Sequence, residues 1–194
     1  MNRLVYIQGP AYYSSTLEVF EDYGFSITRN IQEAEGIVLT GGEDINPAIY
    51  GEQPHPSTYF DIERDVVDMR AAEYGLNNHR FLIGICRGGQ LLNCMNGGKL
   101  VQDIPNHENG EHEVYDFVDK KYRKVISIHH QEMIPESRFG EVIAAADLNS
   151  KGEWKDIEVV WYDKSKSFCF QSHPEFGYKK TSDYFFELLE RYWK

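Results

Sequence analysis

Cys86 stands in a setting that is typical of a catalytic nucleophile. The segment LIGICRGGQ (82–90) runs from a short apolar stretch into a cysteine that has a glycine two positions before it and another two positions after it. This pattern has the form of a nucleophile elbow with sulfur in place of the serine oxygen. A tight strand-to-helix turn leaves no room for side chains at the glycine positions, and the start of the following helix favours a thiolate. A buried structural cysteine in such a turn is the alternative.

A histidine and a carboxylate follow a second apolar stretch. In FQSHPEF (170–176), Pro174 separates His173 from Glu175. Proline favours an extended conformation for the residue before it, and residues two apart in an extended segment point the same way. We therefore expect Glu175 to hydrogen-bond the imidazole and set its tautomer, while His173 exchanges a proton with the Cys86 sulfur. Taken alone, this motif also fits a loop histidine beside a carboxylate.

Two glycines follow a third apolar stretch, in LTGGEDINP (39–47). Backbone N–H groups in a glycine turn are well suited to face an oxyanion. We expect the amides of Gly42 and Arg87 to form the oxyanion hole for a tetrahedral intermediate, with Gly41 beside the substrate. An ordinary turn that ends a strand is the alternative for this segment.

The other cysteines and histidines carry weaker signals. Cys94 falls on an apolar helix face and Cys169 in an apolar strand, so both are predicted to be core residues. The segment HENGEHE (107–113) holds two histidines five residues apart around Asn-Gly, which favours a loop over a metal site, and we expect no metal or other cofactor. His129 and His130 are adjacent at a strand end, so their side chains should diverge. His130 is expected near the substrate.

These motifs lie at the ends of predicted strands that alternate with helices in the first half of the chain. Short apolar runs that end in glycine or cysteine predict strands over residues 3–9, 36–42 and 80–86. Helical spacing predicts helices over residues 14–25, 60–76 and 88–98. Ser15 and Glu18 have the spacing of a capping box. The second helix places four apolar side chains at helical spacing: Ile62, Val66, Met69 and Ala72.

The second half of the chain is richer in strands. They are predicted over residues 113–118, 124–128, 141–146, 157–162 and 167–172, and the last segment, TSDYFFELLERYWK, is predicted to be an amphipathic helix. Alternating strands and helices imply a parallel sheet that is covered on both faces, and the later strands would extend or flank it. We therefore predict one three-layer α/β domain over residues 1–194, with a mostly parallel central sheet.

Composition narrows the partners and the compartment. The chain of 194 residues carries a net charge of −11, which argues against nucleic acids and anionic membranes as partners. The basic segment DKKYRK (119–124) is interpreted as a solvated turn. The apolar run at the N-terminus is too short for a signal peptide, and no run approaches the length of a membrane span. A cytoplasmic location with three free thiols is expected.

Together, these motifs resemble the class I (triad) glutamine amidotransferase superfamily. Within it they look most like the γ-glutamyl hydrolases of the peptidase C26 type, such as γ-glutamyl-γ-aminobutyrate hydrolase. The resemblance covers nearly the whole chain as a single domain of that class. Five segments carry it, in the expected order: LTGGEDINPAIYGE, DIERD, GICRGGQLLNCMNGGKLVQDI, SIHHQEM and FQSHPEF.

The resemblance implies a flavodoxin-like fold and a triad of Cys86, His173 and Glu175. It also implies a γ-glutamyl thioester on Cys86 that water resolves. Arg87 follows the cysteine where many amidotransferases carry leucine, and this favours the hydrolase branch.

The resemblance further implies where the substrate binds. Gln90 should help to bind the glutamyl group, and the backbone around Ser127 and Ile128 should meet its α-amino and α-carboxylate groups. We therefore expect cysteine-dependent hydrolysis of a small γ-glutamyl conjugate, which releases glutamate and an amine. Two alternatives stay open: a glutaminase subunit that delivers ammonia to a separate synthetase, and a non-catalytic thiol sensor on the same fold. The sequence also leaves open the identity of the amine and the oligomeric state, including a homodimer.

Overall fold

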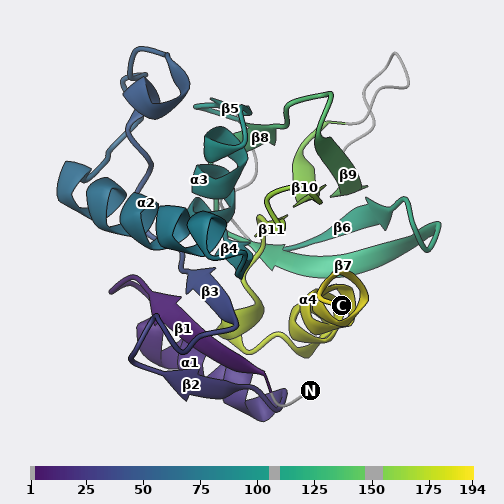
Figure 1. The fold of residues 1–194 in the computed structure, drawn as a ribbon. Coiled ribbons are helices and arrows are strands. Elements are labelled where there is room, and N and C mark those ends of the chain that lie inside the picture. Colours follow the sequence, from purple (N-terminus) through teal and green to yellow (C-terminus); the bar gives the residue numbers. More distant parts are fainter. Residues whose placement is uncertain (1–2, 105–109, 147–154) are drawn as a thin grey trace.

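A nine-stranded sheet forms the middle layer of the fold (Figure 1). The computed structural model describes residues 3–104, 110–146 and 155–194. In sheet order the strands are β2 (Ser26–Thr28), β1 (Leu4–Gln8), β3 (Gly36–Leu39), β4 (Phe81–Ile85), β11 (Ser167–Phe170), β10 (Ile157–Tyr162), β9 (Gly140–Ala145), β6 (Gly110–Asp116) and β7 (Lys121–Ser127).

The sheet is mostly parallel. Strands β2, β1, β3, β4 and β11 pair in parallel, and the remaining strands are added by antiparallel pairs. Among the described strands of this sheet, only β10 and β6 run against the direction of the others, as the pairings require. A separate antiparallel pair joins β5 (Lys99–Val101) to β8 (Glu132–Ile134).

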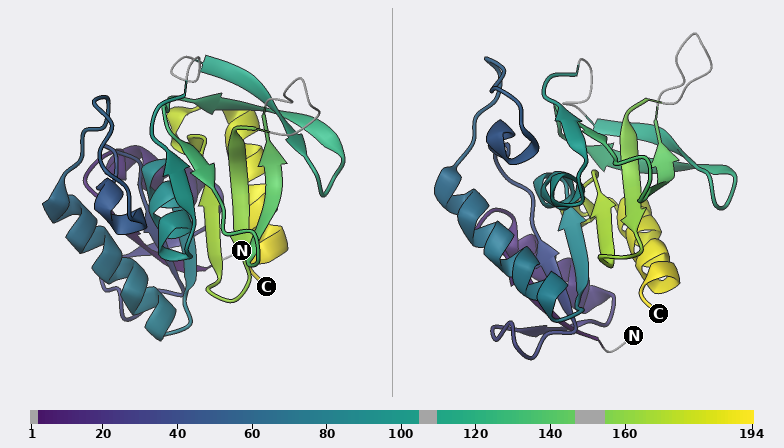
Figure 2. Two further views of the ribbon diagram at one scale, coloured as in Figure 1. Left: turned by 90° about the horizontal axis from the view of Figure 1, so that it is seen from above. Right: turned by 45° about the horizontal axis from the view of Figure 1, so that its top comes forward.

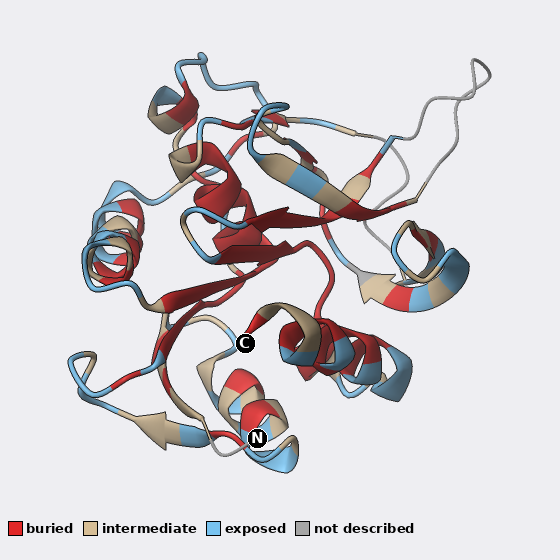
Figure 3. Ribbon diagram, turned by 45° about the vertical axis from the view of Figure 1, so that its right-hand side comes forward, coloured by how far each residue is buried: buried red, intermediate tan, exposed pale blue. Residues whose placement is uncertain are grey.

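Helices cover both faces of the sheet. One face is covered by α1 (Tyr13–Asp22) and α4 (Lys179–Tyr192), and the other by α2 (Ile62–Asn77) and α3 (Arg87–Met95) (Figure 2). Two apolar clusters fill the spaces between these layers, and the buried strands lie between them (Figure 3). The first is centred on aromatic rings that include Phe20, Phe168 and Phe185, and the second on aliphatic side chains that include Leu82 and Leu91. The predicted three-layer α/β architecture is confirmed.

The register of the parallel strands brings their carboxyl ends to one edge. Leu39 of β3 and Cys169 of β11 both pair with Gly84 of β4. The residues that follow these three strands therefore emerge beside one another, at the edge where open parallel sheets bind ligands.

The capping-box prediction is wrong. Helix α1 begins at Tyr13, and its N-cap is Tyr12, which has a φ of 57° and no side-chain capping bond. Ser15 lies inside the first turn, where its hydroxyl donates to the Tyr12 carbonyl at 3.1 Å. The helix starts too early for Ser15 and Glu18 to act as a box.

The predicted apolar stripe of α2 is also wrong at its start. Ile62 is 58 % exposed and Val66 is 41 % exposed, whereas Arg64, Asp65 and Asp68 are buried. These charged side chains pack against polar partners near the sheet edge, as described below. Helix propensity and spacing identified the helix, but charge pairing decides which side faces inward.

Three short strands, β2, β5 and β8, were not predicted from the sequence. Each has only three residues, which is too few to show a strand period.

Candidate active site

Cys86 occupies a strained turn between β4 and α3. Its φ is 50° and its ψ is −112°, a conformation that residues other than glycine rarely adopt. Its N–H donates to the Phe170 carbonyl at 2.7 Å, and its own carbonyl accepts from the Gln90 N–H at 3.0 Å. The turn is therefore fixed by β11 on one side and by the first turn of α3 on the other.

The two glycines around Cys86 are needed for the reason that the sequence indicated. A β-carbon at Gly84 would lie 2.4 Å from the Gly88 carbonyl carbon, and one at Gly88 would lie 2.2 Å from the Leu39 carbonyl oxygen. Both contacts are with backbone, which cannot move aside without disturbing the sheet.

His173 and Glu175 form a buried hydrogen-bonded pair. The distance between His173 Nδ1 and Glu175 Oε1 is 2.7 Å, and both side chains are almost completely buried. His173 is extended and Pro174 begins a short 3₁₀ helix, Pro174–Phe176, which turns Glu175 back toward the ring. Burial lowers the pKa of His173, but the Cys86 sulfur and the Glu175 carboxylate outweigh it and raise this pKa to about 10. The surroundings therefore favour the imidazolium form.

Two aromatic rings hold the imidazole in place. Phe176 stacks on His173 with ring centroids 4.2 Å apart and planes 6° apart, and Tyr12 meets His173 edge-on at 5.6 Å. Gly41 lies against the same ring, because a β-carbon there would be 3.0 Å from His173 Cε1. Tyr12 and Phe176 were not predicted as site residues, since nothing in their local sequence indicates the contact.

Gln171 links the nucleophile to Gln90. Its Nε2 lies 3.7 Å from Cys86 Sγ, and its Oε1 accepts from Gln90 Nε2 at 3.2 Å. Gln90 Nε2 also lies 3.4 Å from the Gln131 carbonyl oxygen. The contact of Gln171 with sulfur was missed, although this residue opens the Gln-x-His-Pro-Glu motif.

A cavity of about 50 Å³ opens beside the sulfur, and it is lined by Gly42, Asp44, Cys86, Gln90, Ile128, His129, His130 and Gln131. The cavity thus brings together several of the predicted substrate residues. Ser127 ends β7 directly before this lining segment.

The amides expected to form an oxyanion hole are available. Within the described part of the chain, neither Gly42 N–H nor Arg87 N–H has a hydrogen-bond acceptor in the protein. Arg87 is the first residue of α3, where N–H groups lack an acceptor within the helix. Its side chain does not face the cavity but is buried, with only 1 % of it exposed.

Four buried charges lie behind this edge of the sheet. Arg87 pairs with Asp65 and with Asp68, the latter at 2.6 Å, and Arg64 Nε donates to the same Asp68 oxygen at 2.7 Å. Burial raises the pKa of Asp65 and lowers that of Arg87, and the ion pairs oppose both shifts. None of these pairings was predicted, because α2 was expected to turn an apolar face inward.

The two adjacent histidines diverge, as expected. His130 Nε2 lies 3.0 Å from Asp44 Oδ1, whereas His129 Nε2 lies 3.2 Å from Glu158 Oε1. His112 also reaches this Glu158 oxygen, at 3.1 Å.

Glu158 is therefore a buried carboxylate that two histidines share, and it also accepts from the Ser172 hydroxyl at 2.9 Å. Burial raises its pKa, but hydrogen bonds from His112 and His129 outweigh burial and hold this pKa well below its usual range. Within the described ranges, no group of three or more His, Cys, Asp or Glu side chains is arranged to hold a metal ion. His107 lies outside those ranges.

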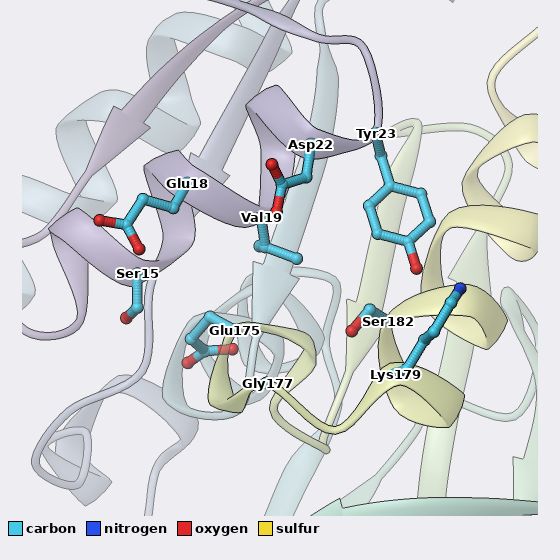
Figure 4. Close-up of a pocket in the computed structure, with 9 residues that line it drawn as sticks. All are labelled: Ser15, Glu18, Val19, Asp22, Tyr23, Glu175, Gly177, Lys179 and Ser182. Carbon is cyan, nitrogen blue, oxygen red and sulfur yellow. The ribbon is translucent and has the colours of Figure 1, made fainter.

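A larger pocket, of about 490 Å³, lies between α1 and the start of α4 (Figure 4). Its lining includes Glu175 and Lys179 but neither Cys86 nor Gln90, so it lies on the Glu175 side of the His173–Glu175 pair and away from the sulfur. The smaller cavity is where a substrate carbonyl can meet the thiol. Among the described residues, no helix has the length and apolar character needed to cross a membrane.

Comparisons with known proteins identify the family of this chain. The family model described as Peptidase C26 matches residues 19–151, which include the glycine turn and the elbow but end before His173. A glutamine amidotransferase-like protein of Lactococcus lactis, YvdE, is 36 % identical over 193 residues, covering 83 % of this chain and 79 % of the relative. A second lactococcal homologue of YvdE is 37 % identical over 102 residues, which are 46 % of this chain and 54 % of that relative.

Solved structures share the fold. A glutamine amidotransferase from Thermotoga maritima superposes with a TM-score of 0.66 at 19 % identity, over 98 % of this chain and 84 % of that one. A protein described as a GMP synthase subunit, from Thermoplasma acidophilum, superposes with a TM-score of 0.68 at 16 % identity, over 99 % of this chain and 96 % of that one. At these identities the superpositions show the flavodoxin-like fold alone.

Proposed function

This chain belongs to the peptidase C26 family of glutamine amidotransferase-like amide hydrolases, and we propose that it hydrolyses the γ-glutamyl bond of a small conjugate. The proposal rests on one observation above all. A strained cysteine at the end of β4 shares a site with a buried histidine whose Nδ1 lies 2.7 Å from a carboxylate. This arrangement fits a nucleophile, a base and an orienting group.

In the proposed first half-reaction, Cys86 Sγ attacks the γ-carbonyl carbon while its proton is held on His173 Nε2, in the imidazolium form that the surroundings of this ring favour. The carbonyl oxygen becomes an oxyanion that accepts hydrogen bonds from the Gly42 and Arg87 N–H groups. The intermediate collapses when the C–N bond breaks. His173 then gives its proton to the departing amine, and a glutamyl thioester stays on the sulfur.

In the second half-reaction, water replaces the amine. His173 takes a proton from the water as its oxygen attacks the thioester carbon, and a second oxyanion forms in the same hole. The C–S bond then breaks, His173 keeps the proton beside the sulfur, and glutamate leaves. Glu175 keeps Nδ1 protonated throughout, so that Nε2 faces the reacting atoms.

The cavity lining suggests how the glutamyl group is held. Gln90 lies beside the sulfur, and the backbone at Ser127 and Ile128 is proposed to meet the α-amino and α-carboxylate groups. The His130–Asp44 pair lines the same cavity, and we expect it to contact the polar end of the substrate.

A second candidate function is a glutaminase subunit that supplies ammonia to a separate synthetase. It is favoured by the relative YvdE, a glutamine amidotransferase-like protein that is 36 % identical over 83 % of this chain, whereas the GMP synthase subunit of Thermoplasma acidophilum adds only a shared fold. The chemistry on Cys86 would be the same, but glutamine would be the substrate and a partner chain would be required.

Glutamate release from a panel of compounds tests these proposals. The panel contains glutamine and γ-glutamyl amides of amines and amino acids, with Cys86→Ala as the inactive variant and Cys94→Ala as a matched control elsewhere in α3. Turnover of a conjugate but not of glutamine, lost only in Cys86→Ala, supports the hydrolase. Turnover of glutamine alone, stimulated by cell extract, supports the glutaminase alternative. No turnover while Cys86 is still alkylated would overturn both and favour a thiol sensor.

A further inference from the structure

Arg64 holds the peptide bond between Gly41 and Gly42 from behind. Its Nη2 donates to the Gly41 carbonyl oxygen at 3.2 Å and to Thr40 Oγ1 at 3.2 Å, and it lies 3.4 Å from the Thr40 carbonyl oxygen. Arg64 is only 7 % exposed, so these contacts are shielded from water. The Gly41 carbonyl therefore points toward α2 and is held there by a charged donor.

This contact fixes where the Gly42 N–H points. The carbonyl and N–H of a trans peptide point in opposite directions, and the described residues contain no cis peptide. With its carbonyl turned toward Arg64, the unit directs the Gly42 N–H to the opposite side. The site lies on that side: Gly41 is against the His173 ring, and Gly42 lines the cavity with Cys86.

The glycine pair cannot fix this orientation by itself. Glycine accepts positive and negative φ about equally, and Gly42 has a φ of +148°. A rotated Gly41–Gly42 unit would present a carbonyl oxygen to the developing oxyanion, where it repels negative charge. An outside contact must therefore select the productive orientation, and Arg64 makes that contact.

Arg64 is in turn oriented by a carboxylate that also holds the second donor segment. Asp68 Oδ2 accepts from Arg64 Nε at 2.7 Å and from Arg87 Nη1 at 2.6 Å. Arg87 carries the other proposed oxyanion N–H on its own backbone. Asp68 Oδ2 thus contacts both Arg64, which holds the Gly41–Gly42 peptide, and Arg87, whose backbone carries the second proposed oxyanion N–H.

We propose that Arg64 is a positioning residue that preforms the oxyanion hole by holding the Gly41–Gly42 peptide with its N–H toward Cys86. This positioning role rests on the proposed function and concerns how its oxyanion hole is held.

Substitution of Arg64 tests the proposal. We expect Arg64→Met to lower kcat about 100-fold with little change in KM, because the loss falls on the transition state. Alkylation of Cys86 by iodoacetamide should stay within about twofold of the wild-type rate, since this displacement forms no oxyanion. Arg70→Met, an exposed arginine on the same helix, is the matched control and should leave kcat unchanged.

Rescue separates positioning from a merely structural role. Guanidinium ion at millimolar concentration should restore part of kcat in Arg64→Ala. Arg64→Lys should recover little, because a single ammonium nitrogen does not reach Asp68 and the Gly41 carbonyl together. A folded Arg64→Met with wild-type kcat would overturn the proposal. So would a parallel loss of kcat and of the alkylation rate in Arg64→Ala that guanidinium ion does not restore.

The failure of this inference is distinguishable from failure of the proposed function. If the wild type turns over no compound in the panel, the proposed function fails. The orientation is then read from crystal structures of the wild type and Arg64→Lys. A Gly41 carbonyl that faces α2 in the wild type and rotates in the variant supports the positioning role, and an identical peptide in both overturns it.

Discussion

His173 must carry a proton in both halves of the proposed reaction. Its contacts leave only Nε2 of the ring to exchange that proton with the sulfur, the amine or water. Nδ1 is engaged by Glu175, while Phe176 and Tyr12 contact the ring. The ring therefore presents Nε2 to the sulfur without a rotamer search. The function and the charge of His173 should therefore depend directly on Glu175.

Glu175→Gln should lower kcat by about 100-fold to 10,000-fold, because an amide N–H facing Nδ1 favours the wrong tautomer and removes a charge that supports the imidazolium. KM should change little, since Glu175 does not face the substrate. Steady-state glutamate release measures both constants. Glu18 is an exposed carboxylate on the pocket between α1 and α4, and Glu18→Gln should behave as wild type. Equal kcat in the two variants would contradict the assigned role.

The raised pKa of His173 predicts how stability depends on pH. The folded-state pKa is about 10, above the ordinary value of 6.5. The contribution of His173 is therefore full below about pH 6.5 and is lost as the pH rises through about 10. Urea unfolding of wild type and His173→Gln should show a free-energy difference that shrinks over this window. A difference that stays constant from about pH 6 to about pH 10 would count against the shift.

At the scale of elements, each reacting group follows the end of a different strand. The glycine turn follows β3, Cys86 follows β4, and His173 follows β11. Sequence reasoning could find these groups because apolar runs, glycines and proline act locally. It missed Arg64, Asp68 and Glu158. Their contacts with Gly41, Arg87 and His129, in that order, join positions 19 to 29 apart and leave no local pattern.

Gly88→Ala should destabilise the protein by about 3 kcal/mol, because its β-carbon would overlap the β3 backbone. Gly51→Ala has open space around the new methyl but keeps a φ of +79°, and should cost about 1 kcal/mol. Urea unfolding of the two variants gives the comparison. If Gly51→Ala were the more costly change, the packing argument for the elbow would be wrong.

The buried charges of α2 predict a large effect from a small change. Asp68→Asn should destabilise the protein by about 3–5 kcal/mol, since two buried arginines lose their shared counter-charge. Val66→Ala on the exposed side of the same helix should cost less than about 0.5 kcal/mol. Thermal and urea unfolding measure both. Similar losses of unfolding free energy in the two variants would mean that the buried charges of α2 do not dominate its contribution to stability.

At the scale of the whole molecule, Trp193 closes the edge of the sheet opposite the site. It stacks on Phe81 with ring centroids 4.7 Å apart, and its carbonyl accepts from Arg3 at 2.7 Å. A β-carbon at Gly36 would lie 2.3 Å from the indole ring. The segment after α4 therefore packs across β1, β3 and β4, far along the chain from each of them.

Trp193→Ala should cost about 3–5 kcal/mol of unfolding free energy, because a large buried ring is replaced by a cavity. Tyr59→Ala, at a site that is 76 % exposed, is the matched aromatic control and should be nearly neutral. Urea unfolding at neutral pH decides between them. A neutral Trp193→Ala would show that the end of α4 contributes nothing to the folded state.

The oxygen atom that Arg64 and Arg87 share on Asp68 has an evolutionary consequence. A lineage that loses Asp68 leaves the buried Arg64 without the carboxylate that pairs with it, and one that loses Arg87 leaves the buried Asp65 without the arginine that pairs with it. Single replacements at these positions should therefore be rare, and compensated ones should persist. Positions 64, 68 and 87 are therefore expected to covary among relatives. Relatives that lack all three of these side chains should hold the Gly41–Gly42 turn through other contacts.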